Sequence, residues 1–508
     1  MFASRSAHDQ PIAVRLVTPL AVVGLTLRAH GSVLRLDGAP TVARVAHPTL
    51  RAVSSGGNSP HPAGGQNPAP KPPLSRGGNS GGQNPTAQPP LSPGGNSPPP
   101  AGGQSPTAQP PLGPIWKVLA LTVSVQAMLL GCSPPELLNT HALLAATWRT
   151  YERDFITPDG QVRDPTSNTG WFHTEHVIRT RTTSEGQSYA MLRAAWVGDR
   201  VEFDRVWHWT RSHLQVRPDR LLSWLWAPDQ NDYWSIAGFN SASDADEDVA
   251  LALIFAGRRW HDAQYLSEAR TMLDDIWRLE VVRNRDAYYL TPGDWGSSYG
   301  PGIVVNPSYL APYEYRIFAT EDPSHPWTSL AESSYRALRD CSWARLGPRH
   351  SAGLPPNWCV IDRVHGGAAS FTIDEGDDYG YDAFRVMWRV AIDAVWYRSA
   401  AARRYLEDSS YLRVRWAGQG WLAAQYRHDG SLERRPWEDP TIYGGDVGNF
   451  VVTDPRAATT LLQEKLLPGY HSRGGVAYWG NRWSSYQQNW AWFGVALASG
   501  ELPNLAGQ

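Results

Sequence analysis

The sequence predicts an all-α fold in which helical hairpins close into a barrel, preceded by a disordered low-complexity segment. After about Pro134, apolar residues recur at three- and four-residue intervals over long stretches, and alternating strand patterns are scarce. A long helical region without a parallel-sheet pattern favours paired helices arranged in a ring. The spacing alone leaves a solenoid or an irregular helical domain open.

The expected helices are separated by turn-rich linkers such as Ala227–Asn231 and Thr291–Trp295. Each carries its apolar residues on one face, the pattern of a helix that packs on one side against a core. In chain order they are Leu137–Phe155, Glu185–Val197, Arg200–Gln215, Asp246–Trp260, Ala263–Val281, Trp327–Leu346, Ala383–Tyr405, Ser410–Gln425 and Ala457–Leu467.

Residues 1–114 are predicted to be a disordered, Pro- and Gly-rich segment. From Ser54 to Pro114 the chain is almost entirely Gly, Pro, Asn, Ser, Gln and Ala, and Gly-Gly-Asn-Ser units begin at Gly56, Gly77 and Gly94. Such a composition buries too little apolar surface to offset the loss of chain entropy. The units have no hydrophobic face, which excludes a stacked solenoid.

Residues 115–131 have the pattern of an export signal. Lys117 precedes a short apolar run that ends at Gly131 and Cys132, and the run is too short to span a bilayer. The ending resembles the lipobox of bacterial lipoproteins. That resemblance implies lipidation at Cys132, a lipid anchor to the membrane, and an exported domain of residues 132–508 on the periplasmic or cell-surface face. A buried helix is the alternative. Because an export signal is not expected behind a long disordered segment, this interpretation also implies that translation begins near Leu112.

The composition excludes one class of partner and limits others. A net charge of −2, with acids and bases interspersed, gives no basic stripe for nucleic acid. The 24 tryptophans suit either a core or a surface that stacks sugar rings. Cys341 and Cys359 either pair or remain buried thiols, and no CxxC spacing indicates a zinc site. No metal and no cofactor are expected.

The motif Ser184–Tyr189 sets one carboxylate at a predicted helix start. Ser184 and Gln187 fit a capping box, which places Glu185 in the first turn, where the helix dipole lowers the pKa of a carboxyl group. Glu185 can act as a general acid only if burial or a neighbouring carboxylate outweighs that effect, and Asp244 is the natural neighbour. An ordinary first-turn acid is the alternative.

A second acidic motif begins the next predicted helix. Asp244, Asp246, Glu247 and Asp248 crowd its first turn, where acids are common. Their mutual repulsion indicates an external partner for at least one of them. A calcium loop of the EF-hand type is disfavoured, because the motif lacks the required Gly and distal Glu.

A third motif, Tyr381–Arg389, pairs Asp382 with Arg385 at the start of another predicted helix. An i, i+3 pair of this kind is usually a surface salt bridge. It is equally suited to a carboxylate that an adjacent guanidinium keeps ionised, as a general base that activates water requires.

Taken together and in this order, the three motifs resemble those of glycoside hydrolase family 8, inverting endoglucanases that include the endoglucanase of bacterial cellulose synthesis operons. The resemblance runs from about Ala145 to Phe493. It implies an (α/α)6 barrel, with Glu185 as the proton donor, Asp382 as the catalytic base and Asp244 as an active-site residue that contacts the sugar at the cleavage point.

The resemblance also implies a set of substrate-binding residues. Leu222–Trp224 and Asn306–Leu310 match substrate-binding segments, and an expanded stretch around Gly296–Val305 leaves one stacking position to either of two aromatic residues. The candidates are Trp224, Tyr309, Arg385, Tyr381 and Trp295, with Tyr299 as the alternative to Trp295. An insertion at Thr166–His176, with His173 and His176, is interpreted as a solvated loop.

The implied activity is inverting, endo-acting hydrolysis of a β-1,4-glucan such as cellulose by a monomeric enzyme, with exopolysaccharide synthesis or export machinery as a potential partner. Chitosan, mixed-linkage glucan and xylan are alternative substrates. A lipid-anchored glucan-binding protein is an alternative from another class, which retention of both Glu185 and Asp382 disfavours. A polysaccharide lyase would need a Tyr, His or Lys base, whereas these motifs are acidic.

Overall fold

The computed structural model describes residues 12–18, 21–30, 33–36, 139–165, 180–229, 231–298, 300, 302–372 and 376–507. The chain divides into two compact units, Met1–Gln109 and Pro110–Gln508. None of the helices in the described ranges combines the length and the apolarity needed to cross a membrane.

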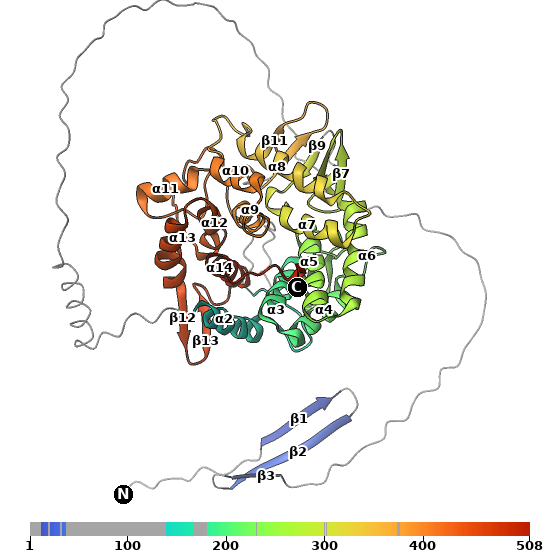
Figure 1. Ribbon diagram of the computed structural model, residues 1–508. Helices are drawn as coiled ribbons and strands as arrows, with labels where there is room; N and C mark the ends of the chain where they lie inside the picture. Colours follow the sequence, from blue (N-terminus) through green and yellow to red (C-terminus); the bar gives the residue numbers. More distant parts are fainter. Residues whose placement is uncertain are drawn as a thin grey trace, which may run out of the picture. The chain divides into compact units, whose positions relative to one another are not determined.

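Inner helices of the second unit form a closed ring (Figure 1). Each packs against the next, and the last returns to the first. In ring order they are α3 (Ser184–Val197), α5 (Ser243–Arg259), α7 (Pro312–Glu321), α9 (Arg385–Tyr397), α12 (Pro440–Thr453) and α14 (Ser485–Ala498). Helices α5 and α14 are buried along almost their whole length, as expected of helices that are apolar on most sides.

An outer helix packs behind each inner one, so inner and outer helices alternate along the chain. The outer helices are α4 (Arg200–His213) on α3, α6 (Ala263–Glu280) on α5, α8 (Trp327–Trp343) on α7, α10 (Ala400–Asp408) on α9, α13 (Pro455–Leu461) on α12, and α2 (Thr140–Phe155) on α14. This arrangement is an (α/α)6 barrel, and it confirms the predicted fold. Helix α11 (Tyr411–Gln419) follows α10 outside this pairing.

Small antiparallel sheets connect the helices. One contains β4 (Thr182–Thr183), β5 (Leu225–Pro228) and β6 (Trp234–Gly238). A second has the order β11 (Ala368–Ser370), β10 (Cys359–Asp362), β9 (Gly302–Val305). Two hairpins, β7 (Val281–Asn284) with β8 (Ala287–Leu290) and β12 (Tyr470–Arg473) with β13 (Val476–Trp479), complete the set in the described part of this unit.

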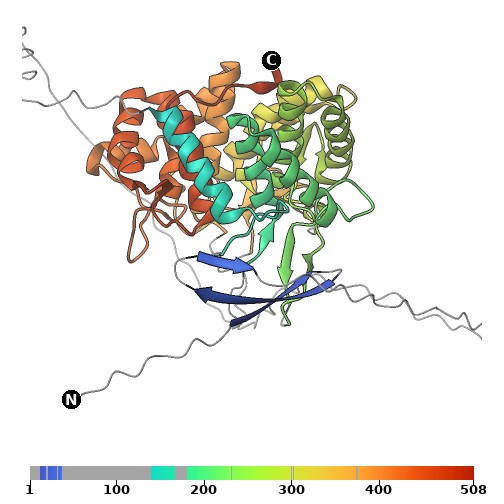
Figure 2. The ribbon, with the colours of Figure 1, turned by 90° about the horizontal axis from the view of Figure 1, so that it is seen from below.

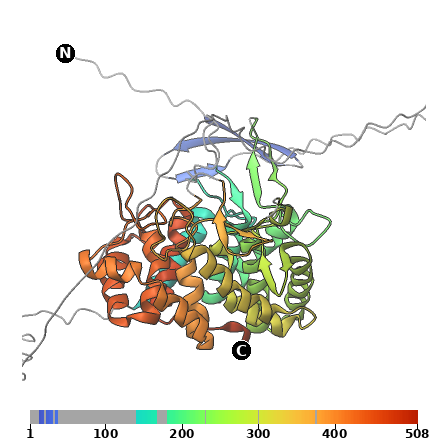
Figure 3. The ribbon, with the colours of Figure 1, turned by 90° about the horizontal axis from the view of Figure 1, so that it is seen from above.

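The beginnings of the inner helices share one end of the barrel. Each inner helix is followed by an outer helix that runs back, so successive inner helices run in the same direction. Strand β4 leads directly into α3, and β6 lies just before α5. Strands β5 and β6, drawn in green, lie at one end of the barrel and the C terminus at the other (Figure 2; Figure 3). The three acidic motifs therefore meet at the strand-bearing end.

The first unit contains three antiparallel strands, β1 (Ile12–Thr18), β2 (Ala21–His30) and β3 (Val33–Leu36). They lie within residues 1–114, where the sequence analysis expected disorder throughout. Val, Leu and Thr recur through these strands and favour an extended backbone, unlike the Gly- and Pro-rich repeats that follow. The repeats from Ser54, the signal-like residues 115–131 and Cys132 lie outside the described residues.

Most predicted helices are confirmed, with shifted ends. One prediction is wrong: the single helix Ala383–Tyr405 is split into α9 and α10, because Arg398 adopts a left-handed conformation (φ 52°). Such a residue ends a helix. Helices α7, α12 and α14 were not predicted.

Candidate active site

Glu185 lies in the first turn of α3, as predicted, but the predicted capping box is wrong. The N-cap is Thr183, whose Oγ1 accepts a hydrogen bond from the Gly186 N–H at 3.0 Å. The Gln187 side chain instead reaches sideways, where its Oε1 accepts from Val162 N at 2.5 Å and its Nε2 donates to Thr210 Oγ1 at 2.6 Å. These bonds tie the start of α3 to two neighbouring segments and so fix the position of the Glu185 backbone.

Asp244 lies in the first turn of α5, which starts at Ser243 and has no side-chain cap. Its Oδ1 accepts from the Ala245 N–H at 2.9 Å, and its side chain is 3% exposed. The other acids of this turn are also buried, and Asp246 accepts from the Leu222 N–H at 2.8 Å. This turn is therefore an internal polar cluster, not a solvated acidic helix start.

Asp382 lies in the turn just before α9, and Arg385 is the first residue of that helix. The Asp382 Oδ1 accepts from Arg385 Nη2 at 2.6 Å, and its Oδ2 accepts from Trp358 Nε1 at 3.0 Å. The Arg385 side chain is only 2% exposed. The pair is therefore not a surface salt bridge: a buried guanidinium holds a carboxylate that is itself 27% exposed.

Arg385 joins all three predicted catalytic acids. Its Nη1 donates to Glu185 Oε1 at 2.5 Å and to Asp244 Oδ2 at 3.0 Å, while its Nη2 contacts Asp382. Tyr189, one turn along α3, donates its O–H to the same Glu185 oxygen at 2.8 Å. Glu185 and Asp382 are each about a quarter open to solvent, at 28% and 27%, whereas Asp244 is closed in. The two acids that would act on a substrate are thus the two that a substrate can reach.

Burial outweighs the attraction of Arg385 at two of these groups. It raises the pKa of Glu185 above its ordinary value, although Arg385 and the Tyr189 hydrogen bond lower it. Burial, and after it the charge of Glu185, raises the pKa of Asp244 to about 7. The condition set for a general acid at the start of α3 is therefore met, mainly through burial.

Aromatic rings surround the cluster. Arg385 lies over the Tyr309 ring, with its Cζ 5.2 Å from the ring centre, and the Trp358 ring centre is 6.1 Å from that of Tyr309. Trp295 lies 6.2 Å from Trp358, with the ring planes tilted by 34°. The structure thus brings Tyr309 and Trp295 together beside the acids; Tyr299 lies outside the described residues.

Trp224 and Tyr381 lie on two further segments at the site. The carbonyl of Trp224 accepts from the Ser184 N–H at 3.0 Å, directly before Glu185. Tyr381 precedes Asp382 and is 39% exposed, and its O–H donates to Asp439 Oδ2 at 2.6 Å. Both predicted binding residues are therefore next to a predicted catalytic acid.

Two residues that the sequence analysis missed hold the Asp382 segment in place. Trp358 donates to the carboxylate, and Asn357 Oδ1 accepts from the N–H groups of Asp382 and Ala383 at 3.2 and 3.0 Å. They lie more than twenty residues from Asp382 in the sequence, and no local pattern marked them. Cys341 and Cys359, whose pairing the sequence left open, form a disulfide.

A second layer of charge lies beneath the cluster. Arg389, one turn beyond Arg385 on α9, donates to Asp248 Oδ2 at 3.0 Å and to Glu314 Oε1 at 2.8 Å. Asp248 follows Asp244 by one turn on α5, so the two helices are linked by two arginine–aspartate pairs. In the described ranges, no group of three His, Cys, Asp or Glu side chains is arranged to hold a metal ion.

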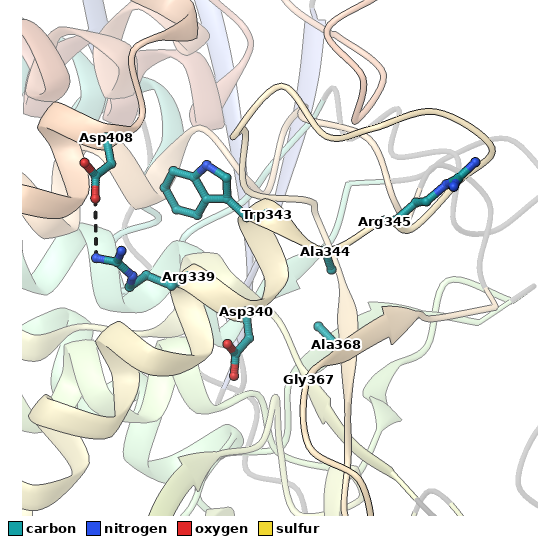
Figure 4. Close-up of a pocket in the computed structure, with 8 residues that line it drawn as sticks. All are labelled: Arg339, Asp340, Trp343, Ala344, Arg345, Gly367, Ala368 and Asp408. Carbon is teal, nitrogen blue, oxygen red and sulfur yellow. Dashed lines mark ion pairs between the residues drawn. The ribbon is translucent and has the colours of Figure 1, made fainter. Parts of the chain in front are cut away.

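A cavity of about 770 Å³ lies elsewhere, between the end of α8, the end of α10 and the β10–β11 turn (Figure 4). It is lined by Trp343, Arg345 and an Arg339–Asp408 ion pair of 3.4 Å, among others. None of the predicted catalytic or binding residues lines it. The candidate active site is therefore the Arg385 cluster.

The ring of six helical hairpins and the buried acids at one end place the chain among (α/α)6-barrel proteins with a carboxylate site. Comparison with known proteins gives the family. Residues 124–418 match the sequence profile of the glycosyl hydrolases family 8, and the chain belongs to this family. It is 31% identical over 268 residues to endoglucanase A of Acetivibrio thermocellus, covering 52% of this chain and 51% of that one. It is 33% identical over 245 residues to the endoglucanase of Escherichia coli, covering 47% and 61%.

The chain thus spans about half to three fifths of the length of these curated relatives. Solved structures agree with the fold. The endo-beta-1,4-glucanase CMCax from Acetobacter xylinum matches with a TM-score of 0.54 at 23% identity, over 71% of this chain and 99% of that chain. A beta-1,3-1,4-glucanase from Paenibacillus sp. X4 matches with a TM-score of 0.57 at 18% identity, over 73% and 95%.

Proposed function

We propose that this chain is an endo-acting glycoside hydrolase that cleaves β-1,4-glucan chains with inversion, using Glu185 as general acid and Asp382 as general base. The observation that carries this proposal is the convergence of Glu185 and Asp382 on the two Nη atoms of Arg385, each with part of its carboxyl group open to solvent. Family membership and the endoglucanases among the relatives support the choice of reaction and substrate.

In the proposed reaction Glu185 donates its proton to the glycosidic oxygen as the bond to the anomeric carbon breaks. A water molecule attacks that carbon from the opposite face, and Asp382 takes the proton that the water loses. Burial raises the pKa of Glu185, which favours the protonated form that this step requires. One turnover leaves Glu185 ionised and Asp382 protonated, and exchange with solvent restores both.

The remaining residues bind and orient the chain of sugars. Arg385 holds both acids in place through one Nη atom each. Tyr309, Trp295, Trp224 and Tyr381 are proposed to contact successive sugar rings, since each lies within one or two residue contacts of the acids. The family resemblance assigns Asp244 a contact with the sugar at the scission point; its carboxylate is 3% exposed and paired with Arg385, so that contact requires substrate to open the cluster.

The test measures reducing-end release from carboxymethylcellulose, chitosan, mixed-linkage glucan and xylan. In Glu185→Gln and Asp382→Asn, the new amide oxygen can still accept the hydrogen bond from Arg385. Both variants are therefore expected to fold like the wild type. Each is expected to lose turnover by a factor of roughly 10²–10⁴, as for loss of an acid–base group. Glu332→Gln, an exposed carboxyl on α8, is the matched control and is expected to stay active.

Release from carboxymethylcellulose that both variants lose would support the proposal. Wild-type activity in either variant would remove that residue from its role. If no polymer is cut but cellulose still retains the protein in a pull-down, the glucan-binding alternative would replace it.

We also propose that the domain is exported and held at a membrane through lipid on Cys132. This rests on the sequence pattern of residues 115–132 alone. Intact mass of the protein from the membrane fraction tests it: a diacylated form that begins at Cys132 is expected, and an unmodified form that begins earlier would refute it.

A further inference from the structure

We propose that the Cys341–Cys359 disulfide, acting through Trp358 and Asn357, positions Asp382, so that full turnover requires the oxidised form of the chain. This inference rests on the proposed function, in which Asp382 is the general base. It makes Trp358, Asn357 and the two cysteines positioning residues, none of which carries out a chemical step.

Asp382 depends on neighbours from elsewhere in the chain for its orientation. It belongs to a turn, outside any helix or strand. One carboxylate oxygen accepts from Arg385 and the other from Trp358 Nε1, at 2.6 and 3.0 Å. With a donor on each oxygen, the carboxylate plane is set by two partners, and loss of either lets it rotate. Asn357 fixes the backbone of the same turn through two N–H groups.

The disulfide anchors the Asn357–Trp358 segment at its next residue, Cys359. Cys359 directly follows Trp358, and its partner Cys341 lies in α8, the outer helix that packs on α7. Both cysteines are fully buried. The chain between α8 and β10 contains no helix or strand, and the covalent bond bridges it between two cysteines that are 18 positions apart. Backbone bonds from Asn357 N to Asp378 O and from Trp358 N to Gly376 O hold the segment on its other side.

The same tether reaches the substrate-binding side of the site. Cys359 pairs with Val305 of β9, and β9 leads through Asn306 to Tyr309, whose ring supports Arg385. The disulfide thus joins α8 to both segments that flank Asp382. Opening it would loosen the position of the base while leaving Glu185, on α3, in place.

Misplacing the base affects the chemical step more than binding. A small displacement of a reacting group costs rate because the transition state requires a narrow geometry. Loss of a hydrogen bond to a charged group, if its full free energy is lost from the transition state, lowers the rate by a factor of about 10 or more. We therefore expect kcat to fall about tenfold in the reduced chain, with KM changed by less than about twofold. Disulfides persist in oxidising compartments, so this dependence would reserve full activity for exported enzyme.

The experiment compares the full chain in four forms: wild type, Cys341→Ala/Cys359→Ala, Trp358→Phe, and the combination of all three substitutions. Kinetics on carboxymethylcellulose are measured well below every melting temperature, with circular dichroism to show that each form is folded. Dithiothreitol is expected to lower kcat of the wild type to that of the cysteine variant, and to leave the cysteine variant itself unchanged, which controls for effects of the reagent.

Two outcomes separate positioning from a general structural role. If the disulfide acts through Trp358, the combined variant loses no more activity than the larger of its components, because both remove the same contact. Losses that multiply would overturn the proposal. Full kcat in folded, reduced wild type would overturn it as well.

A second readout works without activity. Hydrogen exchange of the Trp358 indole N–H, identified by the signal that Trp358→Phe lacks, is expected to accelerate on reduction. Unchanged protection would overturn the inference. If the wild type cuts none of the polymers, the proposed function has failed, and this exchange measurement still decides whether the disulfide holds Trp358.

Discussion

Replacing Arg385 with Met should destabilise the domain in a way that depends strongly on pH. The guanidinium is 2% exposed and contacts Glu185, Asp244 and Asp382 at 2.5, 3.0 and 2.6 Å. Without it, water can rehydrate Glu185 and Asp382, which are about a quarter open. It cannot reach Asp244, at 3% exposure. The cost therefore falls mainly on Asp244, which must take up a proton once its buried partner is gone.

The sign of the pH dependence follows from Asp244. Its pKa is already raised, to about 7, and Arg385 is one of the groups that lower it. Removing Arg385 raises the pKa of Asp244 further above its unfolded value. The folded variant then binds more protons than the unfolded chain between about pH 4 and that raised pKa, so its stability falls as pH rises. At pH 5 Asp244 is neutral in both proteins, and the loss should be that of a hydrogen bond, about 1 kcal/mol. At pH 8, one unit above the wild-type pKa of about 7, proton linkage should add up to about 1.4 kcal/mol to the loss.

Urea unfolding followed by circular dichroism at pH 5 and pH 8 measures both losses. Arg427→Met removes a surface arginine that is 60% exposed and paired with Glu433 at 3.1 Å. This control should change stability by less than about 1 kcal/mol at either pH. A loss below about 1 kcal/mol for Arg385→Met at pH 8, or an equal loss at both pH values, would refute the account of the cluster.

Two further predictions concern neighbouring parts of the site. Burial raises the pKa of Glu280 to about 8, so the folded state holds a proton that the unfolded chain releases. The free energy of unfolding should therefore fall as pH rises from about 4.5 to 8. Glu280→Gln should flatten this slope by up to about 1.4 kcal/mol per pH unit. Urea unfolding across that range measures the slope, and equal slopes for variant and wild type would contradict the assignment. A Cβ on Gly238 would lie 2.1 Å from Trp224 Nε1, so Gly238→Ala must displace the indole and should raise KM for carboxymethylcellulose severalfold with little change in kcat. Gly418→Ala, whose Cβ meets open space, should leave both constants unchanged, and an unaltered KM in Gly238→Ala would argue that Trp224 binds no sugar.

The helical fold could be predicted where helices are amphipathic. Helices α4, α6 and α8 lie outside the inner ring and show one apolar face to the core, so their residue spacing marked them. Helices α12 and α14 belong to the inner ring and are buried on most sides, so neither has a polar face to give a period. Helix α12 also carries three glycines where it packs closely on its neighbours; a Cβ on Gly444 would lie 2.1 Å from the Trp490 carbonyl oxygen. The low helix propensity of these glycines therefore disfavoured α12 in the sequence, although close packing in the barrel requires them.

The acids of the candidate site could be predicted because each lies at or just before the start of a helix. Glu185, Asp244 and Asp382 were found from local motifs, and Arg385 from its spacing to Asp382. The role of Arg385 as the common partner of all three acids depends on contacts between residues as far as 200 positions apart. Trp358 and Asn357 reach Asp382 from a loop without a motif, so only the fold reveals them.

The stereochemistry of the first product tests the central claim most directly. The full chain would be incubated with a soluble cello-oligosaccharide, and proton NMR would follow the new reducing end before mutarotation. A general acid and a general base on opposite sides of the scissile bond predict that the α-anomer appears first, and that neither Glu185→Gln nor Asp382→Asn produces it at a comparable rate. Initial release of the β-anomer would contradict the assignment of Asp382 as a base that activates water.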